Sequence, residues 1–459
     1  MQIKSAHSLS VVDRTLDNIM RGWYRISHLS STGSLKLHAG LPDNDIKPLR
    51  EQMQACLESR GGEVSARARA ADLGKAYLEL DTAGRHRFLR LIADEFGVDN
   101  DQLQSATSAY LEQSDDPETL RVLQRNTTPR WIKLFTQFNA LPSGVKFLVD
   151  MRADLVGFLR EDPALAPLDR DLRKLLLSWF DIGFLDLRRL TWNEPASLLE
   201  KLIDYEAVHE IQSWSDLKNR LDVDRCCYAF FHPRMQDEPL IFVQVALVNG
   251  MSRFVGELLD DKAPVENPQS ADTAIFYSIS NTQPGLRGVS LGDFLIKRVV
   301  DDLKIRFPNL GTFATLSPIT RFRPYVETLL EAEDPAPLEP AQAELLRNTV
   351  LQNDQWFEDE SLNKQVEPIL GGLCAHYLVK EKRGIGAADS VANFHLTNGA
   401  LIEQINWLGD RSAQGMSRSF GLMVNYLYKL PSIEKNHEGY VGQGEIKVSS
   451  AVKSLLRGL

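Results

Sequence analysis

Apolar residues recur at steps of three and four along the first part of the chain. One series consists of Leu9, Val12, Leu16, Ile19, Trp23 and Ile26, and others lie within residues 82–97, 147–159 and 172–179. This period places apolar side chains on one face of a helix, and that face must be buried against a partner. The pattern predicts a bundle of antiparallel helices over residues 1–185, with Thr82 as the N-cap of one helix.

The periodicity changes after about residue 220, and no convincing strand comes earlier. Runs rich in β-branched and aromatic residues follow at 226–232, 239–248 and 273–280, bounded by His-Pro and Asn-Gly turn signals. An amphipathic helix over 290–307 then leads into an apolar run at 310–319. Strand, helix and strand in this order predict a βαβ unit. We therefore predict an α+β fold, with the helical bundle followed by a second domain, residues 186–459, built on a mixed central sheet.

Composition narrows the class of protein. A chain with 43% hydrophobic and 25% charged residues is globular, and its formal charge of −10 disfavours broad capture of nucleic acid or an anionic membrane. The N-terminus lacks the apolar region of a signal peptide, and no later run is long enough to span a membrane. The cysteines show neither zinc-site spacing nor the density of a disulfide scaffold; they are Cys56, Cys226, Cys227 and Cys374. These features favour the cytoplasm, with the Cys226–Cys227 pair in a strand core.

The turn "QPGLRGVSLG", residues 283–292, lies between a predicted strand and a predicted helix. Glycines allow a ligand to approach the backbone closely, and free N–H groups at a helix start suit a phosphate. The alternative is a glycine-rich connection without a ligand. Arg287-Gly288, Gly292 and Leu295-Ile296 have the spacing of the pyrophosphate loop of GNAT-type acetyltransferases, with Ser290 in place of the central glycine. The turn is therefore closer to a coenzyme A site than to a dinucleotide site, because G-x-G-x-x-G is absent.

Two further residues are candidates for chemistry. Ser317 ends the strand that follows the amphipathic helix, and strand ends of this kind contact ligands in open α/β sheets. A lone serine before a proline is more often a turn residue, and the absence of G-x-S-x-G argues against a hydrolase. His395 lies within "ANFHLTNGA", between two apolar residues. Taken alone, it reads as a core histidine.

Seven strings in the second part of the chain change that interpretation, because their order and length resemble the malonyl-CoA decarboxylase family. They are "FFHP", "DEPLIFVQVAL", "YSISNTQPGLRGVSLGDFLIKRVV", "LSPI", "CAHYLVKEKRG", "VANFHLTNGALIEQINWLGD" and "GLMVNYLY". The resemblance extends over most of the chain, since the helical first part also agrees with that family. It implies an acetyltransferase-like catalytic domain that converts malonyl-CoA to acetyl-CoA and CO2 without a metal or organic cofactor, in a homotetramer.

The resemblance also implies roles for particular residues. The family's catalytic serine and histidine fall on Ser317 and His395, and a tyrosine near the site, counted among the substrate-binding residues, falls on Tyr428. Its coenzyme-binding turn falls on Arg287, Gly288, Val289, Ser290, Leu291, Gly292 and Asp293. Ser290 replaces an acidic residue of some relatives, and Thr320-Arg321 replaces a Pro-Gly that often follows the serine. Asn398 either contacts the ligand or makes structural hydrogen bonds. His232 is predicted to be a structural residue.

These residue types suit a decarboxylation. Loss of CO2 leaves an electron pair beside the thioester, so stabilisation of the resulting enolate governs the barrier. A histidine can then supply the proton that the carbanion needs, which is the role expected of His395. Ser317 either orients the malonyl carboxylate, relays a proton, or acts as a nucleophile that accepts an acyl group. Two other functions stay open: an acyltransferase that uses the same coenzyme pocket, and a non-catalytic malonyl-CoA sensor.

Overall fold

The computed structural model describes residues 19–24, 26, 35–180, 182–289, 295–353 and 355–458. The predicted helix from Leu9 to Ile26 therefore lies partly outside the described residues, and its described positions are helical. None of the helices in these ranges combines the length and the apolar character that crossing a membrane requires.

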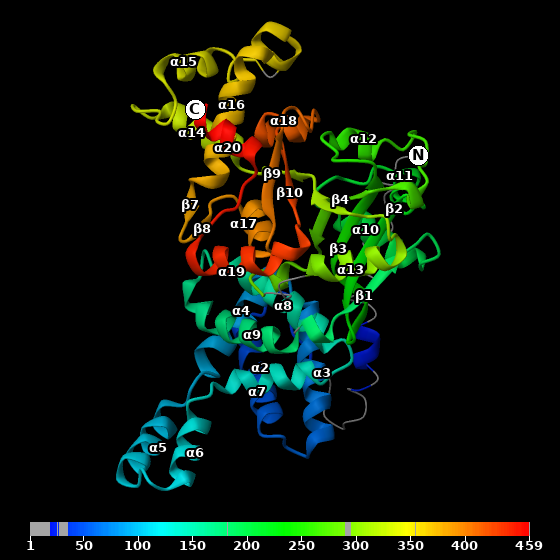
Figure 1. The fold of residues 1–459 in the computed structure, drawn as a ribbon. Helices are drawn as coiled ribbons and strands as arrows, with labels where there is room; N and C mark the ends of the chain where they lie inside the picture. The colour runs from blue at the N-terminus through cyan, green and yellow to red at the C-terminus, as the bar shows by residue number, and fades with distance from the viewer. Residues whose placement is uncertain are drawn as a thin grey trace.

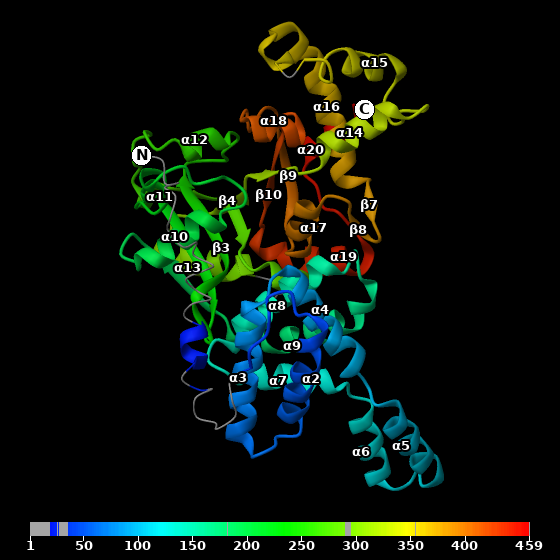
Figure 2. The ribbon, with the colours of Figure 1, turned by 180° about the vertical axis from the view of Figure 1, so that it is seen from behind.

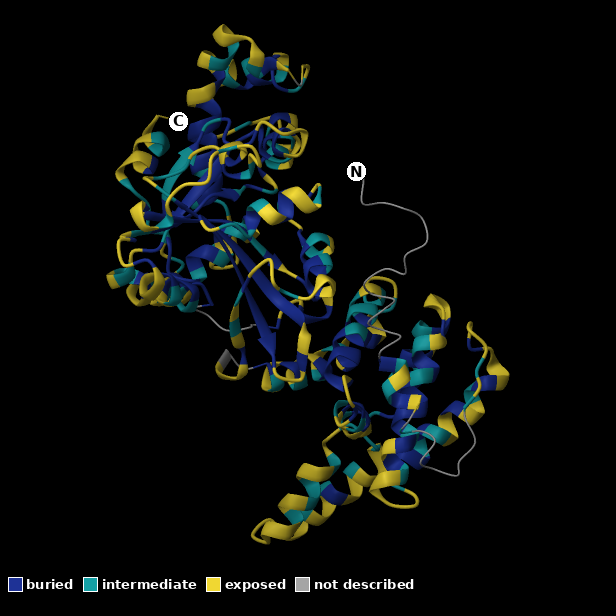
Figure 3. Ribbon diagram, turned by 90° about the vertical axis from the view of Figure 1, so that its right-hand side faces the viewer, coloured by how far each residue is buried: buried dark blue, intermediate teal, exposed yellow. Residues whose placement is uncertain are grey.

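Helices alone build the first part of the described chain (Figure 1). After the segment around Ile19 and Trp23 come α2 (Asp43–Leu57), α3 (Glu63–Glu79), α4 (Thr82–Glu95), α5 (Asn100–Glu112), α6 (Pro117–Asn126), α7 (Arg130–Asn139), α8 (Gly144–Phe158) and α9 (Ala166–Trp179). The apolar faces of α2, α3, α4, α7, α8 and α9 form a shared core, as the periodicity predicts. The α5–α6 pair projects away from the other helices and is largely exposed (Figures 1 and 3).

The N-cap of α4 corrects one prediction. Asp81, not Thr82, precedes the first helical residue, and its side chain accepts a hydrogen bond from the Gly84 N–H. Both residues are common N-caps, but a carboxylate also interacts favourably with the positive end of the helix dipole. Phe88 and Ile92 are buried on one face of α4, as expected.

A mixed sheet forms the core of the second part. Its strands are β1 (Asp186–Leu190), β2 (Arg225–His232), β3 (Met235–Val248), β4 (Thr273–Asn281), β5 (Thr312–Thr315), β6 (Ser317–Pro318), β9 (Leu401–Asn406) and β10 (Met423–Leu427). They lie in the order β1-β2-β3-β4-β5-β10-β6, with β9 also paired to β10. Strands β1 to β4 are antiparallel, and β4 pairs with β5 in parallel through α13 (Leu295–Arg306). The predicted βαβ unit and the mixed central sheet are confirmed.

Strand β1 was not predicted, because no strand was expected before about residue 220. Its sequence, DLRRL, carries three charged residues, and among the described strands it pairs with β2 alone, at the edge of the sheet. Edge strands commonly carry charges, which discourage pairing with another chain, so composition alone does not reveal them. Arg188 of β1 lies over the ring of Phe231 in β2, where its side chain covers part of the sheet.

Both faces of the sheet are buried. Alternate residues of β2 pack into different cores: Cys226, Tyr228 and Phe230 on one side, and Cys227, Ala229 and Phe231 on the other. The first face contacts α13 and the helical region, whereas α10 (Ala196–Tyr205), α11 (Trp214–Arg220) and α12 (Val255–Leu259) cover the second. Figure 3 shows the strands as the most deeply buried elements. The Cys226–Cys227 pair is strand core, as predicted, and both thiols are free.

The remaining elements cover the β9–β10 side of the sheet (Figures 1 and 2). They are α14 (Phe322–Glu331), α15 (Pro340–Asn348), α16 (Glu360–Val379), the hairpin β7 (Lys382–Arg383) and β8 (Gly386–Ala387), α17 (Ser390–Thr397), α18 (Ala413–Ser419), α19 (Ile433–Gln443) and α20 (Ser450–Arg457). Helix α17 packs against α19 near the level of α8 (Figures 1 and 2). This arrangement brings α17 next to the strand ends that carry Ser317.

Candidate active site

Ser317 and His395 lie together inside the second part of the molecule. Ser317 begins β6, and His395 is in the last turn of α17. The Ser317 Oγ and the His395 Nε2 are 3.1 Å apart, within hydrogen-bonding distance. Only 6% of Ser317 and 2% of His395 are exposed. Two residues that the sequence separates by 78 positions therefore share one buried site.

A helix cap and two ring contacts fix the position of the His395 ring. Asp389 caps α17 by accepting hydrogen bonds from the N–H groups of Val391 and Ala392, which sets where the helix begins. The ring stacks on Tyr426, with centroids 4.5 Å apart and planes inclined by 26°. The Tyr428 hydroxyl lies 2.8 Å from Nδ1. Both ring nitrogens thus have a partner, and the side chain has one defined orientation.

The hydrogen bonds around Ser317 indicate which nitrogen of His395 carries the proton. The Ser317 hydroxyl donates to Thr315 Oγ1 at 2.8 Å. A serine has one hydroxyl proton, so the 3.1 Å contact then requires His395 Nε2 to donate to Ser317 Oγ. It follows that Nδ1 accepts from Tyr428. The network assigns the Nε2–H tautomer, in which the proton faces the serine.

Thr315 and Tyr426 belong to this site but were not predicted. Thr315 is fully buried at the end of β5, and its Oγ1 also accepts a hydrogen bond from the Tyr426 N–H at 3.2 Å. Asn425 donates from Nδ2 to the Thr315 carbonyl at 2.7 Å. These contacts join β5 to β10, and strand pairing of this kind has no local signal. The string "TLSPI" contains Thr315, but nothing in it indicates that the threonine accepts a hydrogen bond from the serine hydroxyl.

Burial sets the protonation of the site. It lowers the pKa of His395 to about 3, because the imidazolium would lose its hydration. Burial likewise raises the pKa of Tyr428 well above its usual value, so the hydroxyl keeps its proton. The imidazole of His395 is therefore neutral. An anion bound beside it would raise the pKa of His395 again, since an opposite charge favours the charged ring.

A cavity of about 590 Å³ lies between the predicted coenzyme turn and α17. Of the predicted binding residues, Arg287, Gly288, Val289 and Asn398 line it, while Ser290, Leu291, Gly292 and Asp293 lie outside the described residues. The other lining residues are Leu240, Ile241, Asn281, Gln283, Pro284, Leu286, Leu295, Asn393, Phe394 and Thr397. The Phe394 ring contacts the His395 ring edge-to-face, 5.1 Å between centroids. One aromatic ring thus connects the cavity with the imidazole.

Asn398 and Gly399 end the helix that carries His395. Asn398 donates from Nδ2 to the Phe394 carbonyl at 2.9 Å, and it also lines the cavity. Gly399 has a φ of +80°, and a Cβ there would lie 2.3 Å from the Ile433 carbonyl oxygen. Only glycine fits this conformation and this close approach. The Asn-Gly pair after the histidine therefore has a structural reason, namely to end α17 tightly against α19.

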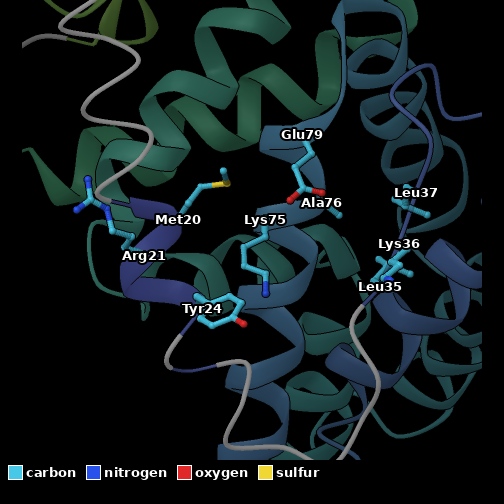
Figure 4. Close-up of a pocket in the computed structure, with 9 residues that line it drawn as sticks. All are labelled: Met20, Arg21, Tyr24, Leu35, Lys36, Leu37, Lys75, Ala76 and Glu79. Atoms are coloured by element: carbon cyan, nitrogen blue, oxygen red, sulfur yellow. The ribbon is translucent and has the colours of Figure 1, made fainter. Parts of the chain in front are cut away.

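Other candidates lie away from this site. His232 is a structural residue, as predicted: its Nε2 lies 3.0 Å from the Trp179 carbonyl and its Nδ1 accepts from the Arg234 N–H. A cavity of about 760 Å³ lies in the helical region (Figure 4). It is lined by Met20, Arg21, Tyr24, Leu35, Lys36, Leu37, Lys75, Ala76 and Glu79. None of these residues was a candidate from the sequence.

Comparison with known proteins identifies the family. The family model for the malonyl-CoA decarboxylase N-terminal domain matches residues 96–180, and that for the C-terminal domain matches residues 183–459. The mitochondrial malonyl-CoA decarboxylase of Anser anser anser is 34% identical, covering 97% of this chain and 94% of that protein. The mitochondrial enzyme of Rattus norvegicus is 36% identical, covering 92% of this chain and 90% of that protein.

Solved structures agree. The crystal structure of malonyl-CoA decarboxylase from Rhodopseudomonas palustris is 41% identical, with a TM-score of 0.85 over 89% of this chain and 99% of that one. The structure from Agrobacterium vitis is also 41% identical, with a TM-score of 0.83 over the same shares. Because both family models match and these relatives are similar over nearly the whole length, the chain belongs to the malonyl-CoA decarboxylase family.

Proposed function

We propose that this chain releases CO2 from malonyl-CoA at the pair formed by Ser317 and His395, with the coenzyme held along the turn at residues 283–289. Membership of the family makes the chain a carboxy-lyase that converts malonyl-CoA to acetyl-CoA and CO2. The observation that carries the site is the 3.1 Å contact between the Ser317 Oγ and the His395 Nε2, beside the cavity that the turn lines.

The proposed reaction uses three groups of this chain. The malonyl carboxylate binds beside His395 and raises its pKa, so the ring takes one proton from solvent and becomes an imidazolium. The bond between the carboxylate carbon and the α-carbon then breaks, CO2 leaves, and the electron pair moves into the enolate of the thioester. His395 transfers its Nε2 proton to the α-carbon, which gives acetyl-CoA. The transfer leaves His395 as a neutral imidazole, so each turnover consumes the one proton that solvent supplied.

Ser317 is proposed to orient the carboxylate, not to attack the thioester. Its hydroxyl donates to Thr315, and His395 Nε2 carries a proton in the assigned tautomer, so no free base receives the serine proton. An orienting hydroxyl can hold the breaking bond in line with the carbonyl π system. Acyl-enzyme trapped on Ser317 during turnover, detected by mass spectrometry of the intact protein, would instead establish the nucleophile.

Tyr428 is proposed to hold the tautomer of His395, because its hydroxyl is the partner of Nδ1. Replacing Tyr428 with Phe removes that hydrogen bond and little volume. We expect kcat to fall by about 3- to 10-fold, the equivalent of one net hydrogen bond of about 1 kcal/mol. KM should change little, since Tyr428 is absent from the cavity lining. Steady-state kinetics test this, and an unchanged kcat would remove Tyr428 from the mechanism.

The assay that tests the function supplies malonyl-CoA alone to protein dialysed against EDTA. Release of CO2 and formation of acetyl-CoA without an acceptor are the expected results. Turnover that requires an amine or alcohol would indicate an acyltransferase, and binding without turnover would indicate a sensor. We further propose that no metal or organic cofactor takes part, because the thioester itself accepts the electron pair. Activity that EDTA abolishes and a divalent cation restores would contradict this.

Assembly and location are also proposals. We infer a homo-oligomer, a tetramer by resemblance to the family, with the helical region as the oligomerisation domain at residues 1–185 and the catalytic domain at residues 186–459. The exposed side chains of Leu111 and Leu120 on the projecting α5–α6 pair support an interface there. Light scattering of the purified protein tests the mass. A cytoplasmic location remains proposed for this chain, whereas the names of the curated relatives say mitochondrial.

A further inference from the structure

A buried arginine of the helical region holds the coenzyme turn. Arg152, on α8, donates from Nη1 to two carbonyl oxygens of the turn, those of Gly285 at 2.6 Å and Arg287 at 2.9 Å. Its Nε donates to Asp169 of α9 at 2.8 Å, which fixes the guanidinium and balances its charge. Only 3% of Arg152 is exposed. Because the guanidinium is buried and bonded on two sides, its hydrogen bonds to the turn have a fixed direction, unlike those of a mobile surface side chain.

Two more contacts tie the same turn to the helical region. Arg173 of α9 donates from Nε to the Gly288 carbonyl at 2.7 Å. Gly288 has a φ of +74°, a conformation that favours glycine. Gly285 packs so closely on α8 that a Cβ would lie 1.7 Å from the Val149 carbonyl oxygen. The turn thus follows β4 and precedes α13 in the chain, whereas α8 and α9 carry the side chains that hold it.

A carbonyl held in one orientation also fixes the direction of the N–H group in the same peptide unit. A peptide unit is planar and trans, so its N–H points to the side opposite its C=O. The bond from Arg152 to the Arg287 carbonyl therefore turns the Gly288 N–H away from α8. Gly288 lines the cavity, and backbone N–H groups in turns of this kind bind phosphate oxygens. Without Arg152, the same peptides would have to be ordered when the ligand binds, which weakens binding.

We propose that the helical region positions the coenzyme turn, with Arg152 as the positioning residue that sets the affinity for coenzyme A thioesters. The inference rests on the proposed function, in which the turn binds the coenzyme. It gives the helical region an indirect part in substrate binding, besides any part in assembly. Arg173 contributes in the same way from the exposed side of the turn.

The test compares four variants for coenzyme A affinity by isothermal titration, together with KM, kcat and melting temperature. Arg152→Met should raise both the Kd for coenzyme A and the KM for malonyl-CoA by about 10-fold or more, with a smaller change in kcat. Arg152→Lys, which keeps a charged donor but lacks the Nε that bonds Asp169, should recover part of the affinity. Arg173→Met changes an exposed side chain, should fold normally, and should raise Kd by about 3-fold. The coenzyme-induced rise in melting temperature should shrink in parallel.

Arg85→Met is the matched control. Arg85 also pairs with an aspartate of α8, Asp154, at 3.2 Å, but has no contact with the turn among its described bonds. It should lower the melting temperature and leave the Kd unchanged. If Arg152→Met and Arg173→Met behave like this control, the inference is wrong.

A fifth variant separates the inference from the proposed function beneath it. Gly288→Val disturbs the turn itself and should weaken coenzyme A binding, whatever Arg152 does. If Gly288→Val leaves the Kd unchanged, the turn is not the coenzyme site and the proposed function fails at that point. If Gly288→Val weakens binding but the arginine variants do not, only the role of the helical region fails. Should Arg152→Met not fold, Arg152→Lys and Arg173→Met decide.

Discussion

Replacing His395 with Asn should lower CO2 release by about 10²- to 10⁴-fold, the usual contribution of a general acid. The shorter amide can still reach the Tyr428 hydroxyl, which now bonds Nδ1, but it has no group at the position of Nε2. The proton donor is thereby lost while the packing on Tyr426 and α17 is largely kept. Coenzyme A affinity should stay within about 2-fold of the unmodified protein, because His395 does not line the cavity.

The measurement is kcat from CO2 release, with the Kd for coenzyme A from calorimetry. His86→Asn serves as the control, since His86 pairs with Asp162 in the helical region, at 2.9 Å, and takes no part in the site. That variant should retain full turnover. Normal turnover in His395→Asn would remove the imidazole from the mechanism, whereas a loss of coenzyme affinity equal to the loss of kcat would mean that the pocket had collapsed.

Replacing Ser317 with Ala should lower kcat by about 10²-fold, in line with the loss of one directed hydroxyl donor from a dry site. The hydroxyl is buried between Thr315 and His395, so its removal also leaves the Nε2–H without its partner. The double variant of Ser317→Ala and His395→Asn separates one shared site from two independent effects. If both residues act on the same carboxylate, the double variant should be little slower than His395→Asn alone.

Additive losses in the double variant would show that the two side chains act separately. Ser317→Ala cannot form an acyl-enzyme under either mechanism, because it lacks the hydroxyl that would carry the acyl group. The mass spectrum of the unmodified protein during turnover is therefore the informative one. An acyl group on Ser317, formed and consumed at the rate of turnover, would replace the orienting role with a nucleophilic one.

Local patterns in the sequence predicted the elements that have strong periodicity. Strands β2, β3 and β4, helix α13 and the parallel strand β5 follow from period-two and period-3.6 patterns. β1 was missed because charged residues occupy an edge strand, where pairing with β2 decides its conformation. The sequence does not distinguish Asp81 from Thr82 as the cap of α4, because both are common N-caps. They differ in their interaction with the helix dipole, which favours the carboxylate of Asp81.

The site was less accessible to sequence reasoning. Resemblance to the family pointed to Ser317 and His395, since residue pattern alone favoured a turn serine and a core histidine. Thr315 and Tyr426 reach the site through the pairing of β5 with β10, a long-range contact that leaves no local pattern. Arg152 was equally hidden, because a helical arginine normally reads as a solvated residue, and its burial depends on how α8 meets the turn.

The central claim is that one buried hydroxyl and one imidazole receive the malonyl group together. A crystal structure with a malonyl-CoA analogue whose carboxylate is replaced by a sulfonate tests this most directly. We predict that sulfonate oxygens lie within about 3 Å of both the Ser317 Oγ and the His395 Nε2, with the diphosphate against the turn at Gly288. A sulfonate bound elsewhere, with Ser317 and His395 still bonded to each other and out of its reach, would contradict the account.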